Sequence, residues 1–344
     1  MIKIGILGAE TTAAGELIRI LINHPDIELK TAASESEAGR HISDIHRGLT
    51  GDTDLQASST LLPEGHDAVF LCGEPWMAMQ WMQLNADKPE MSDLRIIDLT
   101  GAFRDGSHNM VYGFPEYNRK AMVRGARRAS IPSPAAIAVE TALFPLAKNL
   151  LLDGAVNATV SIAATENFNN SQSAASRDGS PSYTDRGTST RLDPIAPQEN
   201  RPDGDAIARE ITTALQSIQP TFGGSMSLRL SRDGALSRGV TAVIESQCGV
   251  AVSELQRLYN DAYDDHNFTY LVSDVPTIAD VANTNKCLLH IDYAASNGTG
   301  LPSLRITSVI DNLLKGSAGT AVHCMNLLFG LSERTGLSLK ASAF

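Results

Sequence analysis

The chain has 344 residues, of which 42% are hydrophobic and 19% are charged, a composition typical of a globular protein long enough for two domains. Its formal net charge of -11 argues against nucleic acid or an anionic membrane as a partner, because phosphate groups are bound by clustered lysine and arginine. One local basic cluster is interpreted as a solvated helix face, and it comprises Arg119, Lys120, Arg124, Arg127 and Arg128.

The four cysteines favour a reducing compartment, since they form neither a C-x-x-C pair nor a disulfide framework. They are Cys72, Cys248, Cys287 and Cys324. The first predicted strand begins at Ile2, which leaves no room for a signal peptide, and no apolar run is long enough to span a membrane. We therefore expect a cytoplasmic protein.

The first third of the chain is predicted to alternate strands with helices. Residues 2–7 predict a buried strand, Gly8 makes the turn, and a helix covers about residues 14–23 before His24-Pro25 stops it. Further strands are expected at residues 27–31, 68–72 and 94–99. This alternation predicts a parallel, doubly wound sheet.

After about residue 134 the pattern favours a mixed sheet. Its expected strands are residues 156–163, 225–230, 240–246, 288–293 and 304–309. One helix is expected at residues 206–218, and another at Ser253, where Gln256 closes a capping box. Residues 166–205 predict a long polar loop, and an apolar last helix at about residues 319–331 is expected to pack back onto the first domain.

The turn after the first strand is a candidate cofactor site, because bare N–H groups at a helix start suit a diphosphate. Of the G-x-x-G-x-x-G spacing, Gly8 is kept, while Thr11 and Ala14 fill the other two positions. Nucleotide binding and a plain α/β domain both stay open on this local sequence. The candidate contacts are Gly8, Glu10, Thr11, Thr12 and Ala13.

The segment after the second strand bears on the choice of nucleotide. Ser34, Ser36 and Arg40 could bind a 2′-phosphate, whereas Glu35 prefers a free 2′-hydroxyl. On balance we expect NADP(H) over NAD(H).

Five stretches together resemble the N-acetyl-gamma-glutamyl-phosphate reductase family, which reduces an acyl phosphate to a semialdehyde with NADPH. They are residues 8–17, I-D-L-T-G-A-F-R at 97–104, Y-G-F-P-E at 112–116, D-N-L-L-K-G-S-A-G at 311–319 and M-N-L-L-F-G-L at 325–331. The resemblance implies a Rossmann-type domain, residues 1–133 completed by 316–344, and an inserted α+β domain of mixed sheet, residues 134–315, for substrate binding and dimerisation. It also implies a homodimer or homotetramer and further cofactor contacts at Cys72, Gly319 and Thr320.

The catalytic residues of that family are missing here. Residues 131–137 fall on the family's N-P-G-C-Y-P-T, so that Pro134 replaces the nucleophilic cysteine. With Pro202-Asp203 placed on the P-E of H-R-H-x-P-E, Asn200 falls where a histidine should be. A proline cannot form a thioester, so acyl-phosphate reduction by that route is excluded. Cys324 beside His323 is the nearest substitute nucleophile, and a buried helix cysteine is the alternative interpretation.

Direct hydride transfer to an aldehyde needs no nucleophile, only cofactor, carbonyl polarisation and a proton donor. We therefore expect an NADPH-dependent reductase that converts a small amino aldehyde, of the semialdehyde or prolinal type, to an alcohol. The alternatives are the ordinary acyl-phosphate reductase and a non-catalytic nucleotide-binding relative. Ser133, the backbone after Pro134, and Asn200 are the candidate catalytic positions. Other candidate site residues are Glu140, Asn167, Tyr183, Arg104 and Tyr112.

A metal site is not expected. His41 and His46 lie near Asp44, but their spacing matches no strong ligand pattern.

Overall fold

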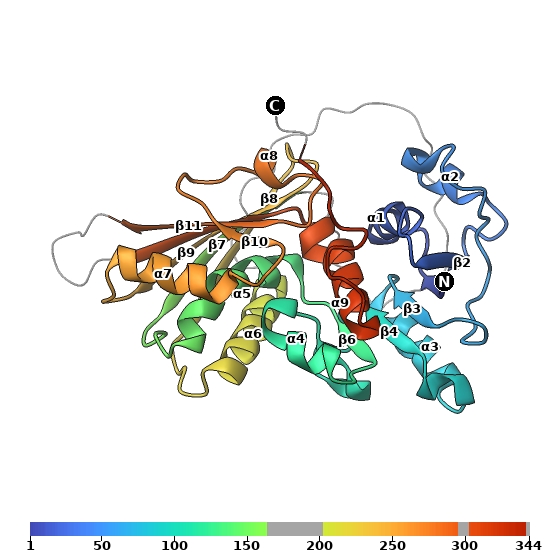
Figure 1. Ribbon diagram of the computed structural model, residues 1–344, viewed down its shortest axis with the longest axis horizontal. Helices are drawn as coiled ribbons and strands as arrows, with labels where there is room; N and C mark the ends of the chain where they lie inside the picture. Colours follow the sequence, from blue (N-terminus) through green and yellow to red (C-terminus); the bar gives the residue numbers. More distant parts are fainter. Residues whose placement is uncertain (164–201, 295–302, 342–344) are drawn as a thin grey trace.

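The computed structural model describes residues 1–163, 202–294 and 303–341, which form two six-stranded sheets with helix α9 between them (Figure 1). The strand order is β2-β1-β3-β4-β6-β5 in the first sheet and β10-β11-β12-β9-β7-β8 in the second. None of the helices in this described part is long and apolar enough to cross a membrane. The α/β fold class is confirmed: all strand pairs of the first sheet are parallel, and the second sheet is mixed.

The first sheet is built from residues 2–130. Its strands are β1 (Ile2–Leu7), β2 (Ile27–Ala33), β3 (Ala68–Leu71), β4 (Arg95–Asp98), β5 (Val111–Tyr112) and β6 (Arg128–Ser130). Its helices are α1 (Thr12–Leu21), α2 (Ile42–Ile45), α3 (Pro75–Asn85) and α4 (Pro115–Val123), with short 3-10 turns at Arg47–Leu49, Pro89–Ser92 and Ser107–Asn109.

Both faces of the first sheet are covered, which explains why β3 is apolar at every position. Ala68 and Phe70 belong to the core that includes α1 and α9, whereas Val69 and Leu71 pack on the opposite side with Trp81 of α3. Successive side chains of a strand point to opposite faces, so a strand buried on both sides reads as a continuous apolar run.

The second sheet is built from residues 156–310. Its strands are β7 (Val156–Ala163), β8 (Met226–Asp233), β9 (Val240–Gln247), β10 (Thr269–Leu271), β11 (Cys287–Ala294) and β12 (Ser303–Ile310). The remaining helices are α5 (Pro134–Lys148), α6 (Pro202–Ile218), α7 (Val252–Tyr263), α8 (Ile278–Val281), the π-helical η5 (Leu314–Ala318) and α9 (Gly319–Phe329).

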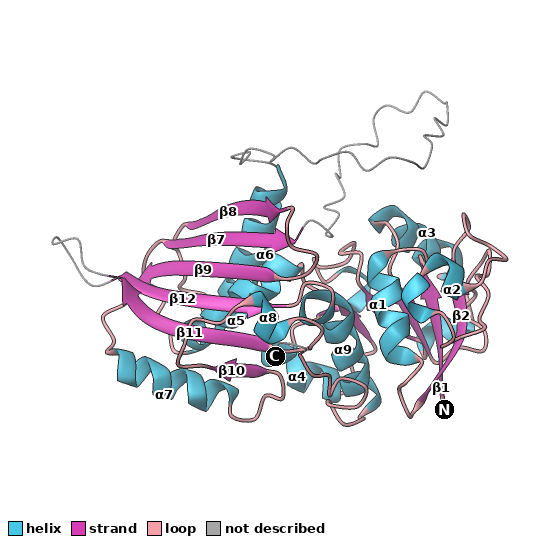
Figure 2. Cartoon of the chain, turned by 90° about the horizontal axis from the view of Figure 1, so that it is seen from above, coloured by secondary structure: helices cyan, strands magenta, loops and turns pink. Residues whose placement is uncertain are grey.

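One face of the second sheet packs on α5, α6 and α7, and no long helix of the described residues lies on the other (Figures 1 and 2). Strand β7 shows the consequence: Val156, Ala158 and Val160 are buried, whereas Asn157 and Thr159 on the other face are exposed. Alternation of this kind is expected for a sheet with one covered face.

Most predicted elements are confirmed, with shifted ends. Helix α1 begins at Thr12 rather than near residue 14, and α9 packs against α4 and β4 as expected. The capping box expected at Ser253 is wrong, because α7 begins at Val252 after Ala251 and its N-cap makes no side-chain bond. The expected loop 166–205 lies mostly outside the described residues. We keep the domain boundaries 1–133 plus 316–344 and 134–315 as a proposal.

Candidate active site

The β1–α1 loop has a geometry that requires glycine at its first position. Gly8 has φ +80, and a Cβ there would lie 2.4 Å from the backbone nitrogen of Gly73 in the β3–α3 loop. The N–H groups of Gly8 and Ala9 both donate to the carbonyl of Ala33 at the end of β2, at 2.9 Å. The loop is therefore held by backbone contacts to the ends of both neighbouring strands.

Thr11 explains how this loop manages without a second glycine. Its hydroxyl donates to the carbonyl of Gly8 at 3.0 Å and accepts from the N–H of Ala14 at 3.2 Å, so the side chain caps α1. The N–H groups of Thr12 and Ala13 have no partner inside the helix, because the first turn of a helix cannot donate to itself. Together with the helix dipole they fit a diphosphate.

The residues expected around the ribose are only partly available. Ser34 and Ser36 lie side by side after β2, with their hydroxyl oxygens 3.3 Å apart. Arg40 forms an ion pair with Glu37 and donates to the carbonyl of Asp44 at 3.4 Å. A 2′-phosphate would therefore compete with Glu37 for the guanidinium.

Three further expected cofactor contacts are buried. Cys72 lies at the end of β3, where burial and the nearby carboxylates of Asp98 and Glu10 raise the pKa of its thiol. Gly319 and Thr320 begin α9, and the Thr320 hydroxyl donates to the carbonyl of Lys315 at 2.6 Å. Their contact with a cofactor stays a prediction.

The turn at the start of α5 contains no thiol. Ser133 is the N-cap, and its hydroxyl accepts from the N–H of Ala136 at 3.3 Å. Pro134 follows at the first helical position, where proline is favoured because its ring pre-sets φ. Since proline carries no N–H, this turn has one amide donor fewer than an ordinary helix start, and the N–H of Ala135 has no partner inside the helix.

A carboxylate of the chain itself fills this helix start. Glu210 of α6 accepts from the backbone N–H of Ser133 at 3.0 Å and from its hydroxyl at 2.9 Å. It also accepts from the Tyr112 hydroxyl at 3.2 Å and pairs with Arg104 at 3.4 Å. Arg104 in addition donates to the carbonyl of Ile131 at 2.9 Å.

Glu140 completes the cluster with a second acid. Its side chain is buried in α5, the Tyr112 hydroxyl lies 2.7 Å from its Oε1, and its Oε2 has no hydrogen-bond partner among the described residues. Burial and the charge of Glu210 raise the pKa of Glu140 well above its ordinary value. Burial thus favours the protonated form of Glu140, and the Tyr112 hydroxyl joins it to the carboxylate of Glu210, whose side chain is 11% exposed.

Comparisons with known proteins decide the family. Residues 3–124 match the family model of the semialdehyde dehydrogenase NAD binding domain, and residues 208–312 match that of the semialdehyde dehydrogenase dimerisation domain. The N-acetyl-gamma-glutamyl-phosphate reductase of Parabacteroides distasonis is 38% identical over 346 residues and that of Phocaeicola vulgatus 37% over 355, each with full coverage of both chains. The chain belongs to the N-acetyl-gamma-glutamyl-phosphate reductase family.

Solved structures support the same fold at lower identity. Aspartate semialdehyde dehydrogenase II of Vibrio cholerae, in complex with ASA, has a TM-score of 0.69 at 16% identity, covering 96% of this chain and 98% of that one. Aspartate semialdehyde dehydrogenase of Candida albicans, solved with NADP, has a TM-score of 0.69 at 15% identity with the same coverage. These structures show the fold, while the assignment of the chain to an oxidoreductase family with an NAD binding domain rests on the relatives and the family model.

Several residues of the family-like motifs hold the scaffold together. Glu116 of the Y-G-F-P-E stretch pairs with Lys315 at 2.5 Å, and both side chains are fully buried. Burial raises the pKa of Glu116, but the charge of Lys315 outweighs it and brings the pKa to about 2. Asp311 similarly binds Arg238 at 2.8 Å, and Arg238 reaches Glu16 of α1 at 2.7 Å. Arg104 of the neighbouring motif, by contrast, pairs with Glu210 at the start of α5.

The cysteines give no support to a substitute nucleophile. All four lie in the described part of the chain and are buried and unpaired. Burial raises the pKa of Cys324 and raises that of Cys287 to about 12, which keeps both thiols protonated. His323, beside Cys324, binds Glu333 at 2.7 Å instead. The interpretation of Cys324 as a buried helix cysteine is the one that fits.

The remaining candidates have mixed outcomes. Asn167, Tyr183 and Asn200 lie outside the described residues. Within residues 1–163, 202–294 and 303–341 no group of three metal-ligating side chains comes together. The basic cluster is not simply a solvated face, because Arg119 pairs with Glu333 at 2.5 Å and Arg128 donates to two backbone carbonyls, those of His108 and Met91.

Glu210 was missed by sequence reasoning, although a signal was present. In α6, Ile207, Ile211 and Leu215 form the buried stripe, and Glu210 follows Ile207 by three residues on that same face. A charge on an apolar stripe indicates a buried partner or a site.

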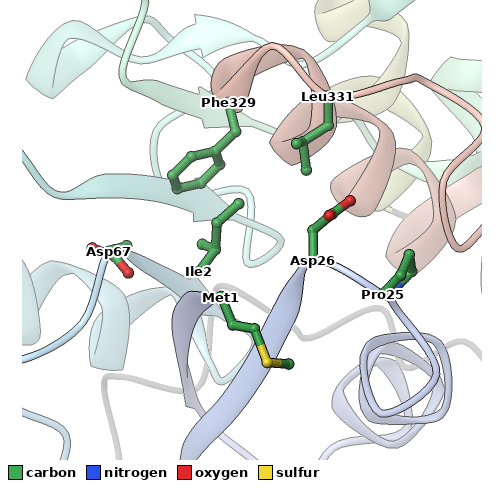
Figure 3. Close-up of a pocket in the computed structure, with 7 residues that line it drawn as sticks. All are labelled: Met1, Ile2, Pro25, Asp26, Asp67, Phe329 and Leu331. Carbon is green, nitrogen blue, oxygen red and sulfur yellow. The ribbon is translucent and has the colours of Figure 1, made fainter.

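A pocket of about 480 Å³ lined by Ile2, Asp26 and Phe329 lies at the opposite, amino end of the first sheet (Figure 3). Ligands of parallel sheets bind at the carboxyl ends, so this pocket is not the candidate site.

Proposed function

We propose that this protein is an NADPH-dependent oxidoreductase that reduces the terminal carbonyl of a glutamate-type substrate directly, without an enzyme thioester. The names of its full-length relatives favour N-acetyl-gamma-glutamyl phosphate as that substrate, with the semialdehyde as product. They support this reaction better than the alcohol-forming reduction expected from the sequence alone. NADPH, when bound, supplies the hydride.

The carrying observation is the start of α5, where Pro134 takes the first helical position and Glu210 binds Ser133. From the motif alignment we infer that Pro134 replaces the family's nucleophile. Because no thiolate is available, the reducing equivalent must reach the carbonyl in one step. With an acyl phosphate, that step makes a tetrahedral alkoxide, which collapses to the aldehyde and expels phosphate. One hydride is gained and one phosphate leaves, so the balance needs no covalent enzyme intermediate.

Alcohol formation from an aldehyde is the second candidate, and the acid cluster is what favours it. The alkoxide left by reduction of an aldehyde must take up a proton. In our proposal that proton comes from protonated Glu140 and passes through the Tyr112 hydroxyl to the Glu210 carboxylate, which delivers it to the alkoxide and leaves Glu140 ionised. Arg104 would stabilise the alkoxide. A Glu210 carboxylate also disfavours a phosphate dianion beside it, which points to an uncharged or amino-bearing aldehyde.

The cofactor, assembly and compartment complete the proposal. Thr12 and Ala13 would hold the diphosphate, Ser34 and Ser36 the 2′-phosphate, with Arg40 released from Glu37. We propose a homodimer or homotetramer, supported by the match to a dimerisation domain and by the sheet face that no long helix covers. The cytoplasm fits four unpaired cysteines.

The test follows nicotinamide absorbance in both directions. NADP with N-acetyl-glutamate semialdehyde and phosphate tests the acyl-phosphate reaction in reverse, and NADPH with the same semialdehyde or with prolinal tests alcohol formation. Turnover that withstands iodoacetamide, with no acyl adduct in the intact mass, supports direct reduction. A trapped acyl adduct would refute it, and NADPH binding without turnover on any of these substrates would favour the non-catalytic relative.

A further inference from the structure

His46 lies against the loop that joins β1 to α1. It follows the short helix α2, and its Nε2 is 2.6 Å from the carbonyl oxygen of Ala9, a residue 37 positions earlier. A carbonyl oxygen can only accept, so Nε2 carries the hydrogen and donates. Ala9 is fully buried, so this contact fixes one peptide group in the middle of the candidate diphosphate loop.

The same ring packs against Gly15 in the first turn of α1. A Cβ on Gly15 would lie 2.6 Å from Nδ1 and 2.8 Å from Cε1 of His46. Glycine inside a helix is about 1 kcal/mol less favourable than alanine, so the helix itself does not account for it. The His46 imidazole accounts for the glycine, because the ring can pack against the helix here only if residue 15 has no side chain.

Because of the geometry of the peptide bond, the His46–Ala9 contact also sets the direction of the next N–H group. The C=O and N–H of a trans peptide point in opposite directions from one plane. Tying the Ala9 carbonyl to His46 therefore aims the N–H of Glu10 away from the ring. That N–H has no acceptor among the described residues, and it adjoins the open N–H groups of Thr12 and Ala13.

We propose that His46 is a positioning residue for the dinucleotide, which holds the Ala9–Glu10 peptide so that the loop's N–H groups converge on the diphosphate. It acts through the loop and needs no contact with substrate. The inference requires dinucleotide binding but no turnover, so it can fail or stand independently of the proposed reaction.

The test measures NADPH affinity by fluorescence titration and the thermal midpoint on the same samples. His46→Ala should weaken NADPH binding about tenfold, the worth of one well-placed hydrogen bond. His46→Gln, which keeps an N–H at similar reach, should restore affinity to within about threefold. His41→Ala is the matched control, because the His41 side chain is exposed and, among the described residues, its ring makes a hydrogen bond with the Gln56 side chain alone, at 3.4 Å. It should bind NADPH like the wild type.

A double-mutant cycle with Gly15→Ala separates positioning from packing. Alone, Gly15→Ala should displace the imidazole and weaken NADPH binding, even though alanine favours the helix. In the His46→Ala background it should have no further effect, because there is no ring left to displace. A thermal shift with unchanged affinity in His46→Ala would overturn the proposal. So would independent, multiplying losses of affinity in the double variant, or a wild type that binds neither NADPH nor NADH.

Discussion

Helices α1 and α5 are both capped by a side-chain hydroxyl, but they differ in what can bind at their first turn. Thr11 caps α1 by accepting from Ala14 at 3.2 Å, and Ser133 caps α5 by accepting from Ala136 at 3.3 Å. At α1 the next amides stay open to an anion from outside. At α5 proline removes one amide, and Glu210 of the chain itself binds the cap.

The difference separates the attraction of a helix start for an anion from the availability of that helix start to a ligand. Family membership alone would lead us to expect both properties at both helix starts. The helix dipole and the free N–H groups attract an anion at any helix start. Whether a ligand can use that attraction depends on whether the chain has already satisfied it. The β1–α1 loop thus leaves its amides open to an outside anion, whereas at the start of α5 Glu210 already binds the amide and the hydroxyl of Ser133.

Gly8→Ala should have the largest effect on the cofactor end. A Cβ 2.4 Å from a backbone nitrogen, at φ +80, forces the two loops apart. We expect NADPH affinity to fall by at least about 100-fold, on the order of 3 kcal/mol, as for strained backbone positions. Titration with NADPH measures it, and Gly39→Ala, also at positive φ but with open space around it, controls for strain alone. Equal losses in both variants would contradict the role of the loop contact.

Glu210→Gln tests the other helix start. If Glu210 transfers the proton, turnover of an aldehyde should fall by about 100-fold or more while NADPH affinity is unchanged. Asp205→Asn, an exposed residue on the same helix, should turn over normally. Undiminished turnover in Glu210→Gln would remove the acid cluster from the mechanism and leave it a structural anchor for α5.

The sequence predicted the geometry of the β1–α1 loop better than the contacts at the start of α5, and the reason is physical. Gly8 and the apolar run of β3 are local signals, because one position or one short pattern carries the constraint. Glu210 meets Ser133 from 77 residues away, and Glu140 meets Tyr112 from 28, so only the fold brings them together. The same holds for Glu116 and Lys315, whose motifs are readable while their pairing is not.

The absence of a cysteine from residues 131–137 is readable from the sequence, and the loss of the family's nucleophile stays a prediction that rests on the motif alignment. The acid cluster beside this turn is not readable, since the pKa of a carboxyl is raised only through burial and a neighbouring charge. The capping box at Ser253 failed for a related reason: several residues can end a loop, and packing of Leu255 and Tyr259 into the core sets where α7 begins.

Glu140→Gln should change how stability depends on pH. Burial raises the pKa of Glu140 in the folded state, so the folded protein binds a proton that an unfolded glutamate releases above about pH 4.3. This contribution is complete below the unfolded pKa and is lost as pH rises through the folded one. The free energy of unfolding of the wild type, relative to Glu140→Gln, should therefore fall from acidic to alkaline pH. Urea titrations across that range measure it, and a constant difference would mean an ordinary, ionised Glu140.

Removing the capping hydroxyls of Thr11 and Ser133 should have the smallest effects, and it compares the two helix starts most directly. Thr11→Ala and Ser133→Ala should each lower the free energy of unfolding by about 1 kcal/mol, the usual worth of an N-cap. Only Thr11→Ala should also weaken NADPH binding, by roughly threefold, because its hydroxyl also bonds the Gly8 carbonyl within the loop. Urea unfolding and NADPH titration on both variants separate the two effects. If Ser133→Ala weakened NADPH binding as much, the start of α5 would have to be part of the cofactor site, and the contrast between the two helix starts would fail.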